Sequence, residues 1–267
     1  MSFFTPFAFI KTEVAAVVDQ DVINFFNRVT ANGGSLTSTE ESAIATLVAD
    51  LKADNIWDDC QAIYPCVGAS AAATQVNLKN TGSFELSFSG GITYSSDGFK
   101  TNGSNGFANT SWAASTAAGQ NDIHIGIMLF ENQSANGIAI GSNDGSTSLN
   151  IYPRYNGSQI YGRINSAGDG PTVTGVTTSK HLYLLSRILS NESALYLDGT
   201  EYNLSTNSNG VAVGNVNIGR NAIAANQYFP AATCFATLGN GLSDTQATDY
   251  TTAIQAFQTT LGGNRPF

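Results

Sequence analysis

One feature limits the folds open to this chain more than any other: the period of its apolar residues changes near residue 80. In residues 12–30, apolar residues recur at the spacing of one face of a helix. Beyond Phe84 they alternate with other residues, as Ile123, Ile125 and Ile127 do. Alternation places every second side chain on the same face of a strand. The sequence therefore predicts a short helical region followed by a long β region.

Capping boxes mark the starts of two further helices. Thr37 with Glu40, and Ser243 with Gln246, follow the Ser/Thr-x-x-Glu/Gln pattern. In this pattern each side chain accepts a hydrogen bond from the backbone N–H of the other residue. The first box opens a helix in the N-terminal region, and the second opens a helix that closes the chain. Residues 55–80 are interpreted as a connector between the helical and β regions.

Asp-Gly and Asn-Gly pairs, which favour tight turns, divide the β region. These pairs stand at 97–98, 102–103, 105–106, 144–145, 156–157, 198–199 and 209–210. Many short strands without helices between them favour an antiparallel sandwich or barrel over alternating strands and helices.

The charge of the chain excludes some classes of function. The net charge is −9 and the sequence pI is near 4.5, so binding to nucleic acid phosphates is disfavoured. No apolar run is long enough to predict a membrane span, and residues 1–10 lack the basic segment of a signal peptide. Cys60, Cys66 and Cys234 are too few and odd in number for a disulfide framework, which favours buried free thiols.

Four segments of the last third of the chain occur in the order found at the end of concanavalin A-like, laminin-G-type (LamG) sandwich domains. They are ALYLDG at 194–199, NIG at 217–219, FPAATCFATL at 229–238 and GLSDTQ at 241–246. This resemblance implies a mainly β fold, an antiparallel concanavalin-like jelly-roll sandwich with a short N-terminal helical region and a C-terminal helix. Residues 1–77 are then an N-terminal helical docking region and connector. Residues 78–267 are the LamG-like β-sandwich with its C-terminal helix.

A second resemblance is to bacteriophage virion proteins that end in such a sandwich. It is carried by RVTANGG at 28–34, LVADLK at 47–52 with Trp57, Tyr64-Pro65, and IQAFQTTL at 254–261. The resemblance implies a virion structural protein on the particle exterior, either a tail-associated receptor-binding adhesin or a capsid decoration or head-fibre protein. It further implies a homo-oligomer, expected to be a trimer. Its partners are then other virion proteins and, for an adhesin, a host surface glycan.

A glycan-active enzyme is the third class that the sandwich brings into question, because one fold supports many functions. Glycoside hydrolysis usually needs two carboxylates that flank the scissile bond. In concanavalin-like hydrolases these carboxylates follow a Glu-x-Asp-x-x-Glu pattern, which this chain lacks. The glutamates of the β region, Glu85, Glu131, Glu192 and Glu201, are isolated from one another. We therefore expect that the chain is not an enzyme and has no catalytic residues.

Residues 151–163 (IYPRYNGSQIYGR) hold the leading candidates for glycan contact. Aromatic rings stack on the C–H faces of sugars, and arginine side chains donate directional hydrogen bonds. The alternative is a set of ordinary cross-strand pairs on a sheet face. The candidates are Tyr152, Arg154, Tyr155, Tyr161 and Arg163.

The N-terminal segment carries a run of apolar side chains that is short for a core of its own. An exposed apolar patch usually meets a partner, although packing on the chain's own helices is the alternative. The candidates for partner docking are Phe3, Phe4, Phe7, Phe9 and Ile10.

No metal ligands and no cofactor are expected from the sequence. Calcium is the one metal to consider, because LamG-type domains often bind it through an Asp carboxylate and backbone carbonyls. Asp97, Asp144 and Asp169 lie in Gly-rich loops, but an Asp-Gly pair is mainly a turn former.

Overall fold

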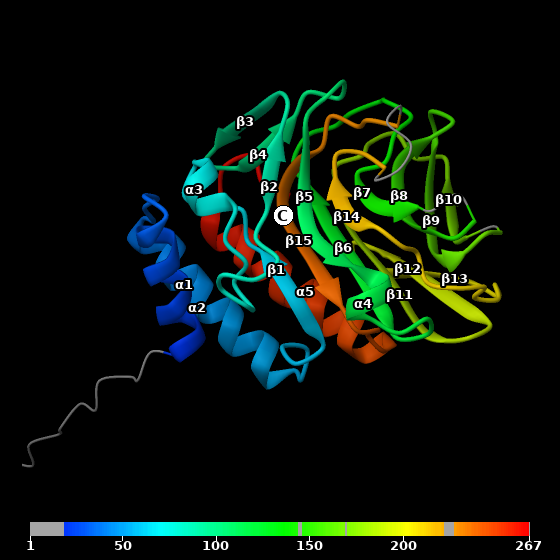
Figure 1. Cartoon of the computed structure of the whole chain (residues 1–267), viewed down its shortest axis with the longest axis horizontal. Helices are drawn as coiled ribbons and strands as arrows, with labels where there is room; N and C mark the ends of the chain where they lie inside the picture. The colour runs from blue at the N-terminus through cyan, green and yellow to red at the C-terminus, as the bar shows by residue number, and fades with distance from the viewer. Residues whose placement is uncertain (1–18, 144–145, 169, 222–226, 267) are drawn as a thin grey trace, which may run out of the picture.

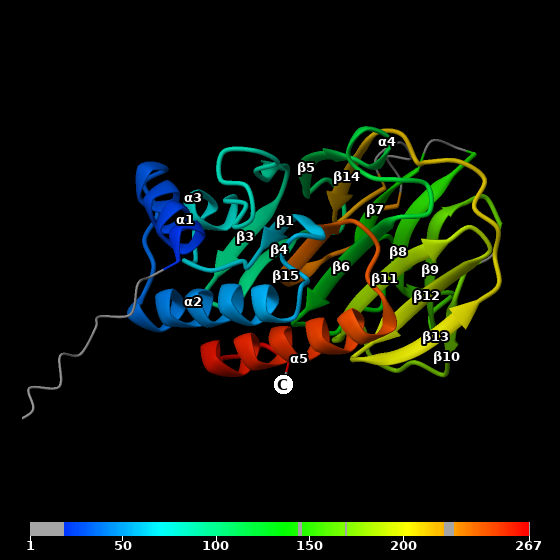
Figure 2. The same ribbon diagram turned by 90° about the horizontal axis from the view of Figure 1, so that it is seen from below.

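The computed structural model describes residues 19–143, 146–168, 170–221 and 227–266. Two antiparallel sheets lie face to face, and helices cover the outer face of one of them (Figures 1 and 2). The expected mainly β, concanavalin-like sandwich with N-terminal helices and a C-terminal helix is therefore confirmed. Within these described ranges, no helix is long and apolar enough to cross a membrane.

The larger sheet, called sheet A here, has eight strands among the described residues. Its strands are, in spatial order, β13 (Thr200–Leu204), β12 (Glu192–Leu197), β11 (Leu182–Leu189), β6 (Ile123–Leu129), β15 (Ala232–Gly239), β4 (Gly98–Thr101) and β3 (Ile92–Ser95). The eighth strand, β1 (Cys60–Tyr64), pairs antiparallel with β15.

The second sheet, called sheet B, has seven strands in the described part of the chain. In spatial order they are β10 (Thr172–Thr174), β9 (Gln159–Ser166), β8 (Ser148–Tyr155), β7 (Ile140–Asn143), β14 (Asn215–Ile218), β5 (Phe107–Ala113) and β2 (Ser87–Ser89). All of these pairings are antiparallel, and β7, β8, β9 and β10 pair as consecutive strands.

An apolar core fills the space between the two sheets. Ile125 and Ile127 of sheet A belong to the same buried cluster as Leu149, Ile151 and Ile164 of sheet B. Full burial of a side chain of this size stabilises the fold by about 1.5–3 kcal/mol. The alternation seen in the sequence thus places one face of each sheet in the interior.

A second apolar core lies between sheet A and three helices: α1 (Gln20–Ala31), α2 (Ser38–Ala53) and α5 (Asp244–Leu261). Met128 and Leu184 on the outer face of sheet A are buried with Leu47 of α2 and Ile254 and Phe257 of α5. Figure 2 shows α2 and α5 lying side by side along this face. Sheet A is therefore buried on both faces.

The helix starts follow the capping chemistry expected from the sequence. Both reciprocal capping boxes form, at Thr37 with Glu40 and at Ser243 with Gln246. Helix α1 begins at Gln20, later than expected, and the residues before Asp19 lie outside the described ranges. The described residues also form two helices of one turn each, α3 (Ala71–Thr74) and α4 (Ala114–Ala117).

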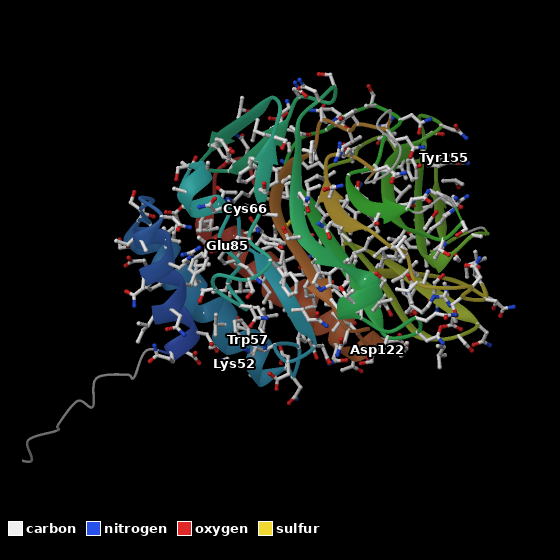
Figure 3. All side chains as sticks on the ribbon, viewed as in Figure 1. Lys52, Trp57, Cys66, Glu85, Asp122 and Tyr155 are labelled. Atoms are coloured by element: carbon white, nitrogen blue, oxygen red, sulfur yellow. The ribbon has the colours of Figure 1, made fainter. Side chains whose placement is uncertain are left out.

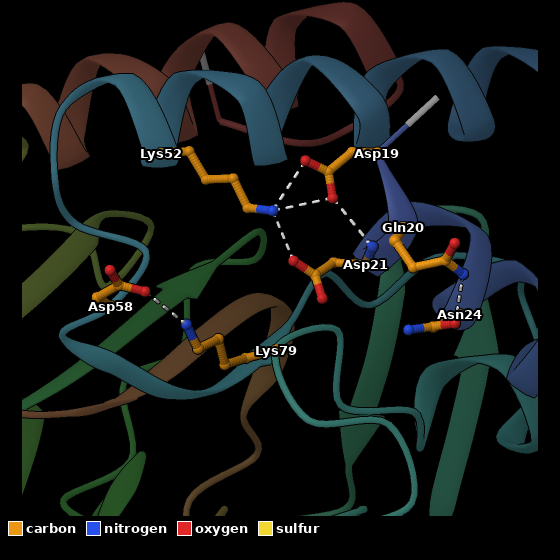
Figure 4. A network of polar contacts seen from close by, with 7 residues as sticks. All are labelled: Asp19, Gln20, Asp21, Asn24, Lys52, Asp58 and Lys79. Atoms are coloured by element: carbon orange, nitrogen blue, oxygen red, sulfur yellow. Dashed lines mark hydrogen bonds and ion pairs between the residues drawn. The ribbon is translucent and has the colours of Figure 1, made fainter. Parts of the chain in front are cut away.

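A polar network joins the two N-terminal helices (Figure 4). Lys52 near the end of α2 places its Nζ atom 2.8 Å from a carboxylate oxygen of Asp19 and 2.6 Å from one of Asp21. The Lys52 ammonium also lies 5.0 Å from the ring centroid of Trp57, and that of Lys79 lies 4.6 Å from it. The two ion pairs of Lys52 hold the start of α1 against the end of α2.

The connector expected over residues 55–80 contains a strand instead. Strand β1 pairs with β15, and its Tyr64 is fully buried in the core between the sheets. The three cysteines are free and buried, as the sequence favours. Burial raises the pKa of the Cys60 thiol to about 12, so this thiol is protonated at neutral pH.

Candidate functional site

The β8–β9 hairpin carries the side chains that the sequence marks as candidates for glycan contact. Ile151 of β8 and Ile160 of β9 point into the core, so their neighbours Tyr152 and Tyr161 lie on the outer face of sheet B. The register places Tyr152 opposite Tyr161. The Asn156-Gly157 turn closes the hairpin with φ values of 48° and 83°. Asn-Gly suits such a turn because both positions need positive φ.

Three tyrosines, Tyr152, Tyr155 and Tyr161, form what we call the tyrosine cluster. The rings of Tyr155 and Tyr161 stack with centroids 5.1 Å apart. The Tyr152 ring lies edge-on to Tyr155 at 5.4 Å and tilted to Tyr161 at 6.1 Å. Aromatic pairs in these geometries stabilise one another beyond their simple burial. Figure 3 places Tyr155 on the side of the sandwich remote from Lys52 and Trp57.

The two candidate arginines have different surroundings. Arg163 lies over the Tyr161 ring, with its guanidinium carbon 5.0 Å from the centroid, and its Nε–H donates to the Tyr161 hydroxyl. Arg154 instead donates from Nε to the Gly157 carbonyl at 2.9 Å and from Nη1 to the Thr177 carbonyl at 2.7 Å. Arg163 therefore belongs to the tyrosine cluster, whereas Arg154 braces the hairpin turn.

The three tyrosines differ in what they expose. Tyr161 is only 7% exposed, so its ring serves as a base on which the others pack. Tyr152 and Tyr155 are half-buried and offer the ring surface that a ligand can reach. Burial raises the pKa of the Tyr152 hydroxyl, an effect that nearby Arg163 opposes. The hydroxyl is therefore protonated at neutral pH and available as a hydrogen-bond donor.

Polar residues that sequence reasoning did not select surround the cluster. Gln227 hydrogen-bonds Tyr152, although the two residues are far apart in the chain. Asn150 lies opposite Arg163, and Gly141 separates Asn150 from Asn217 across the sheet. Both asparagines are 2% exposed, and their Oδ1 atoms have no hydrogen-bond partner among the described residues. Asn150 could have been found from its position two residues before Tyr152 on the same strand face.

The remaining sequence candidates fall elsewhere. Phe3, Phe4, Phe7, Phe9 and Ile10 lie outside the described residues, as do Asp144 and Asp169. The carboxylate of Asp97 accepts hydrogen bonds from the backbone N–H and the side chain of Asn264. Across the described part of the chain, no three His, Cys, Asp or Glu side chains gather as a metal site would require.

Comparison with known proteins finds similarity in fold but not in sequence. No family model matches the chain, and no curated protein matches it. The sialidase of Trypanosoma rangeli in complex with 2,3-difluorosialic acid superposes with a TM-score of 0.53 at 13% identity, over 79% of this chain and 38% of the sialidase chain. A botulinum neurotoxin serotype D binding domain superposes with a TM-score of 0.53 at 11% identity, over 73% of this chain and 51% of that one.

At these low sequence identities, the superpositions show a shared fold and do not show a shared function. The chain spans 38% of the sialidase chain and 51% of the neurotoxin chain. Mouse laminin alpha1 domains LG4–5 align with 42% of this chain at a TM-score of 0.33, too low to compare the two folds. The concanavalin-like sandwich is thus supported, while the laminin-G subtype and the phage origin stay predictions.

The expectation that this chain is not an enzyme is overturned by the comparison. That expectation depended on the missing Glu-x-Asp-x-x-Glu pattern, which describes one arrangement of carboxylates on one kind of sandwich. The likeness to a sialidase chain shows that this type of fold also occurs within glycan-active enzymes. The missing pattern therefore excludes that one arrangement of carboxylates and leaves glycan-active enzymes in general open.

Proposed function

We propose that this chain is a glycan-binding β-sandwich protein and that the tyrosine cluster is its contact surface. One observation carries the proposal: the half-buried rings of Tyr152 and Tyr155 stand on the outer face of sheet B beside Arg163. The rings supply flat apolar surface for the C–H face of a sugar, and Arg163 supplies directional donors for its hydroxyls. A sheet holds these groups more rigidly than a loop does.

The comparisons support a binding role of this kind. One similar structure is the binding domain of a neurotoxin, and another is a sialidase that holds a sialic acid derivative. Both place a sandwich of this fold in proteins that recognise other molecules. They support the class of function, and the residues proposed here depend on the geometry of the β8–β9 hairpin.

We further propose that the protein is displayed on the exterior of a phage particle as a tail-associated adhesin. The support is the resemblance of segments 28–34, 47–52 and 254–261 to virion proteins. In this arrangement the apolar N-terminal segment docks on other virion proteins, the chain forms a trimer, and the tyrosine cluster faces outward. Electron microscopy of particles labelled with an antibody to this chain tests the placement. Label on the tail supports it, and label on the head identifies a decoration or head-fibre protein instead.

Binding to an array of immobilised glycans tests the main proposal. The unmodified chain is expected to bind a subset of glycans, and Tyr155→Ala is expected to weaken that binding by about tenfold, since a buried aromatic contact commonly contributes more than about 1 kcal/mol. Tyr202→Ala is the matched control, because Tyr202 is a half-buried tyrosine on edge strand β13 of the other sheet. Equal binding by both variants, with folding intact, would show that the tyrosine cluster is not the contact surface.

A further inference from the structure

A polar cavity at one end of sheet A is separate from the tyrosine cluster. Its volume is about 650 Å³, which lies within the usual range for small-molecule sites. The β3–β4 hairpin, the segment after β6, the segment before β11 and the residues after α5 all contribute to its walls. Among the described residues that line it, Phe130, which is 7% exposed, has the one apolar side chain.

The two carboxylates in the cavity wall already have hydrogen-bond donors. Glu131 accepts from the Lys100 ammonium at 2.5 Å and from the Gln133 amide at 3.1 Å. Both oxygens of Asp97 accept from Asn264, one from its backbone N–H at 3.1 Å and the other from its side-chain amide at 3.0 Å. Glu131 is therefore neutralised by Lys100, and the oxygens of Asp97 are both hydrogen-bonded, although their donors are neutral.

Lys180 is the positively charged group of the cavity that is left without a counter-ion among the described residues. Its ammonium makes no ion pair and no hydrogen bond within the described residues, whereas Lys100 is paired with Glu131. Thr93 and Ser95, both exposed on edge strand β3, add hydroxyl groups that donate and accept. The wall thus combines the unpaired ammonium of Lys180 with hydroxyl and amide groups and with the Asp97 carboxylate, whose two oxygens are already hydrogen-bonded to Asn264.

We propose that this cavity is a second ligand site and that it binds a small hydroxylated carboxylate, the chemistry of an acidic sugar residue. The ligand carboxylate pairs with the Lys180 ammonium, and its hydroxyls bind the side chains of β3 and Asn132. A dicarboxylate fits poorly, because Glu131 and Asp97 repel a second negative charge. A purely apolar ligand fits poorly as well, because Phe130 offers too little apolar surface.

One backbone carbonyl connects the cavity wall to the β8–β9 hairpin, because it accepts hydrogen bonds from a residue of each. The Thr177 carbonyl accepts a hydrogen bond from Arg154 Nη1 at 2.7 Å and one from Asn132 Nδ2 at 3.5 Å. Asn132 lines the cavity, and Arg154 braces the turn beside the tyrosine cluster. The two surfaces are therefore neighbours on one rim of the sandwich, but the cavity does not depend on the tyrosines for its charge or shape.

Calorimetric titration of the full chain with D-glucuronate, and with D-glucose as the uncharged match, tests this proposal. D-glucuronate is expected to bind saturably, and its affinity is expected to fall as salt is added. D-glucose, which lacks the carboxylate, is expected to bind more weakly. Lys180→Gln is expected to lower the glucuronate affinity about fivefold, the upper end for one solvent-exposed ion pair. Lys79→Gln is the matched control, since Lys79 pairs with Asp58 and is not part of the cavity lining. This variant is expected to bind glucuronate with the affinity of the unmodified chain.

A second variant keeps the test decisive if Lys180→Gln perturbs folding. Thr93→Tyr fills the mouth of the cavity from an exposed strand position and leaves Lys180 in place, so it is expected to abolish glucuronate binding. Tyr155→Ala is expected to leave glucuronate binding intact, which separates this site from the tyrosine cluster. The proposal is overturned if glucuronate shows no saturable binding, or if folded Lys180→Gln and Thr93→Tyr proteins bind it as the unmodified chain does.

Discussion

The outer faces of the two sheets are built from the same alternating pattern and differ in what covers them. On sheet A, Met128 and Leu184 point outward into an apolar core shared with α2 and α5. On sheet B, the outer face carries Tyr152, Tyr155 and Arg163, which are amphipathic and half-buried. Apolar outward positions require a cover, whereas amphipathic ones can face water and a ligand. The outward residues of a sandwich thus indicate which face is structural and which face is available for binding.

Removal of the helical cover is the strongest way to test this comparison. The fragment 78–267 lacks α1, α2, β1 and α3 but keeps α5, so it exposes the part of the outer face of sheet A that the N-terminal helices cover and leaves one edge of β15 unpaired. We expect this fragment to bind an apolar fluorescent dye and to lose cooperative unfolding in urea, which the full chain retains. If the fragment unfolds at the same urea concentration as the full chain, residues 78–267 are an independent domain and the cover is dispensable.

A single substitution on the covered outer face of sheet A should destabilise the protein more than one on the outer face of sheet B. Phe235 of β15 contacts Tyr250 and Phe257 of α5, with ring centroids 6.4 Å and 5.9 Å away. Phe235→Ala is expected to lower the free energy of unfolding by about 3–5 kcal/mol, because the cavity that it leaves is closed on both sides. Tyr155→Ala on the outer face of sheet B is expected to lower it by less than about 1.5 kcal/mol. Urea denaturation measures both, and equal losses would contradict the assignment of one structural and one binding face.

The sequence predicted the sandwich well because its signals are local. Alternation over residues 123–129, Asn-Gly and Asp-Gly turns and two capping boxes each act within a few residues, and the structure follows them. Strand β1 was missed because CQAIY is short and does not alternate. It is buried on both faces, with Ala62 and Tyr64 in the core between the sheets and Ile63 in the core under the helices.

The candidate site was predictable only in part. The spacing of Tyr152 and Tyr161 around the Asn156-Gly157 turn is enough to place them opposite each other. The role of Arg154 was not predictable, because it depends on the carbonyl of Thr177, which a later segment of the chain supplies. Gln227 was hidden for the same reason, since its contact with Tyr152 exists only after the sheets assemble. Contacts between remote segments carry no local pattern.

The buried histidine of sheet A offers a pH test of its covered face. Burial lowers the pKa of His124 from 6.5 to about 4. The hydrogen bond that its Nδ1–H donates to the Asn240 carbonyl acts in the opposite direction and raises the pKa, but by less. The unfolded chain takes up this proton near pH 6.5 and the folded chain only near pH 4. The resulting stability is therefore complete above pH 6.5 and is lost as the pH falls toward 4, by about 3 kcal/mol. In urea denaturation between pH 5 and 7, His124→Gln is expected to show a flatter dependence on pH than the unmodified chain, and identical slopes would refute this role.

The smallest expected effect separates the two arginines of sheet B. Arg163 lies over Tyr161 and faces the ligand surface, so Arg163→Ala is expected to weaken glycan binding severalfold, equivalent to about 1 kcal/mol. Arg154 donates to the Gly157 and Thr177 carbonyls, so Arg154→Ala is expected to lower the free energy of unfolding by about 0.5–1.5 kcal/mol. Once folded, the Arg154 variant should bind glycan nearly as well as the unmodified chain, because the stacked tyrosine rings remain. Binding and urea denaturation measured on both variants decide the matter: the reverse pattern would make Arg154 the ligand contact and Arg163 the brace.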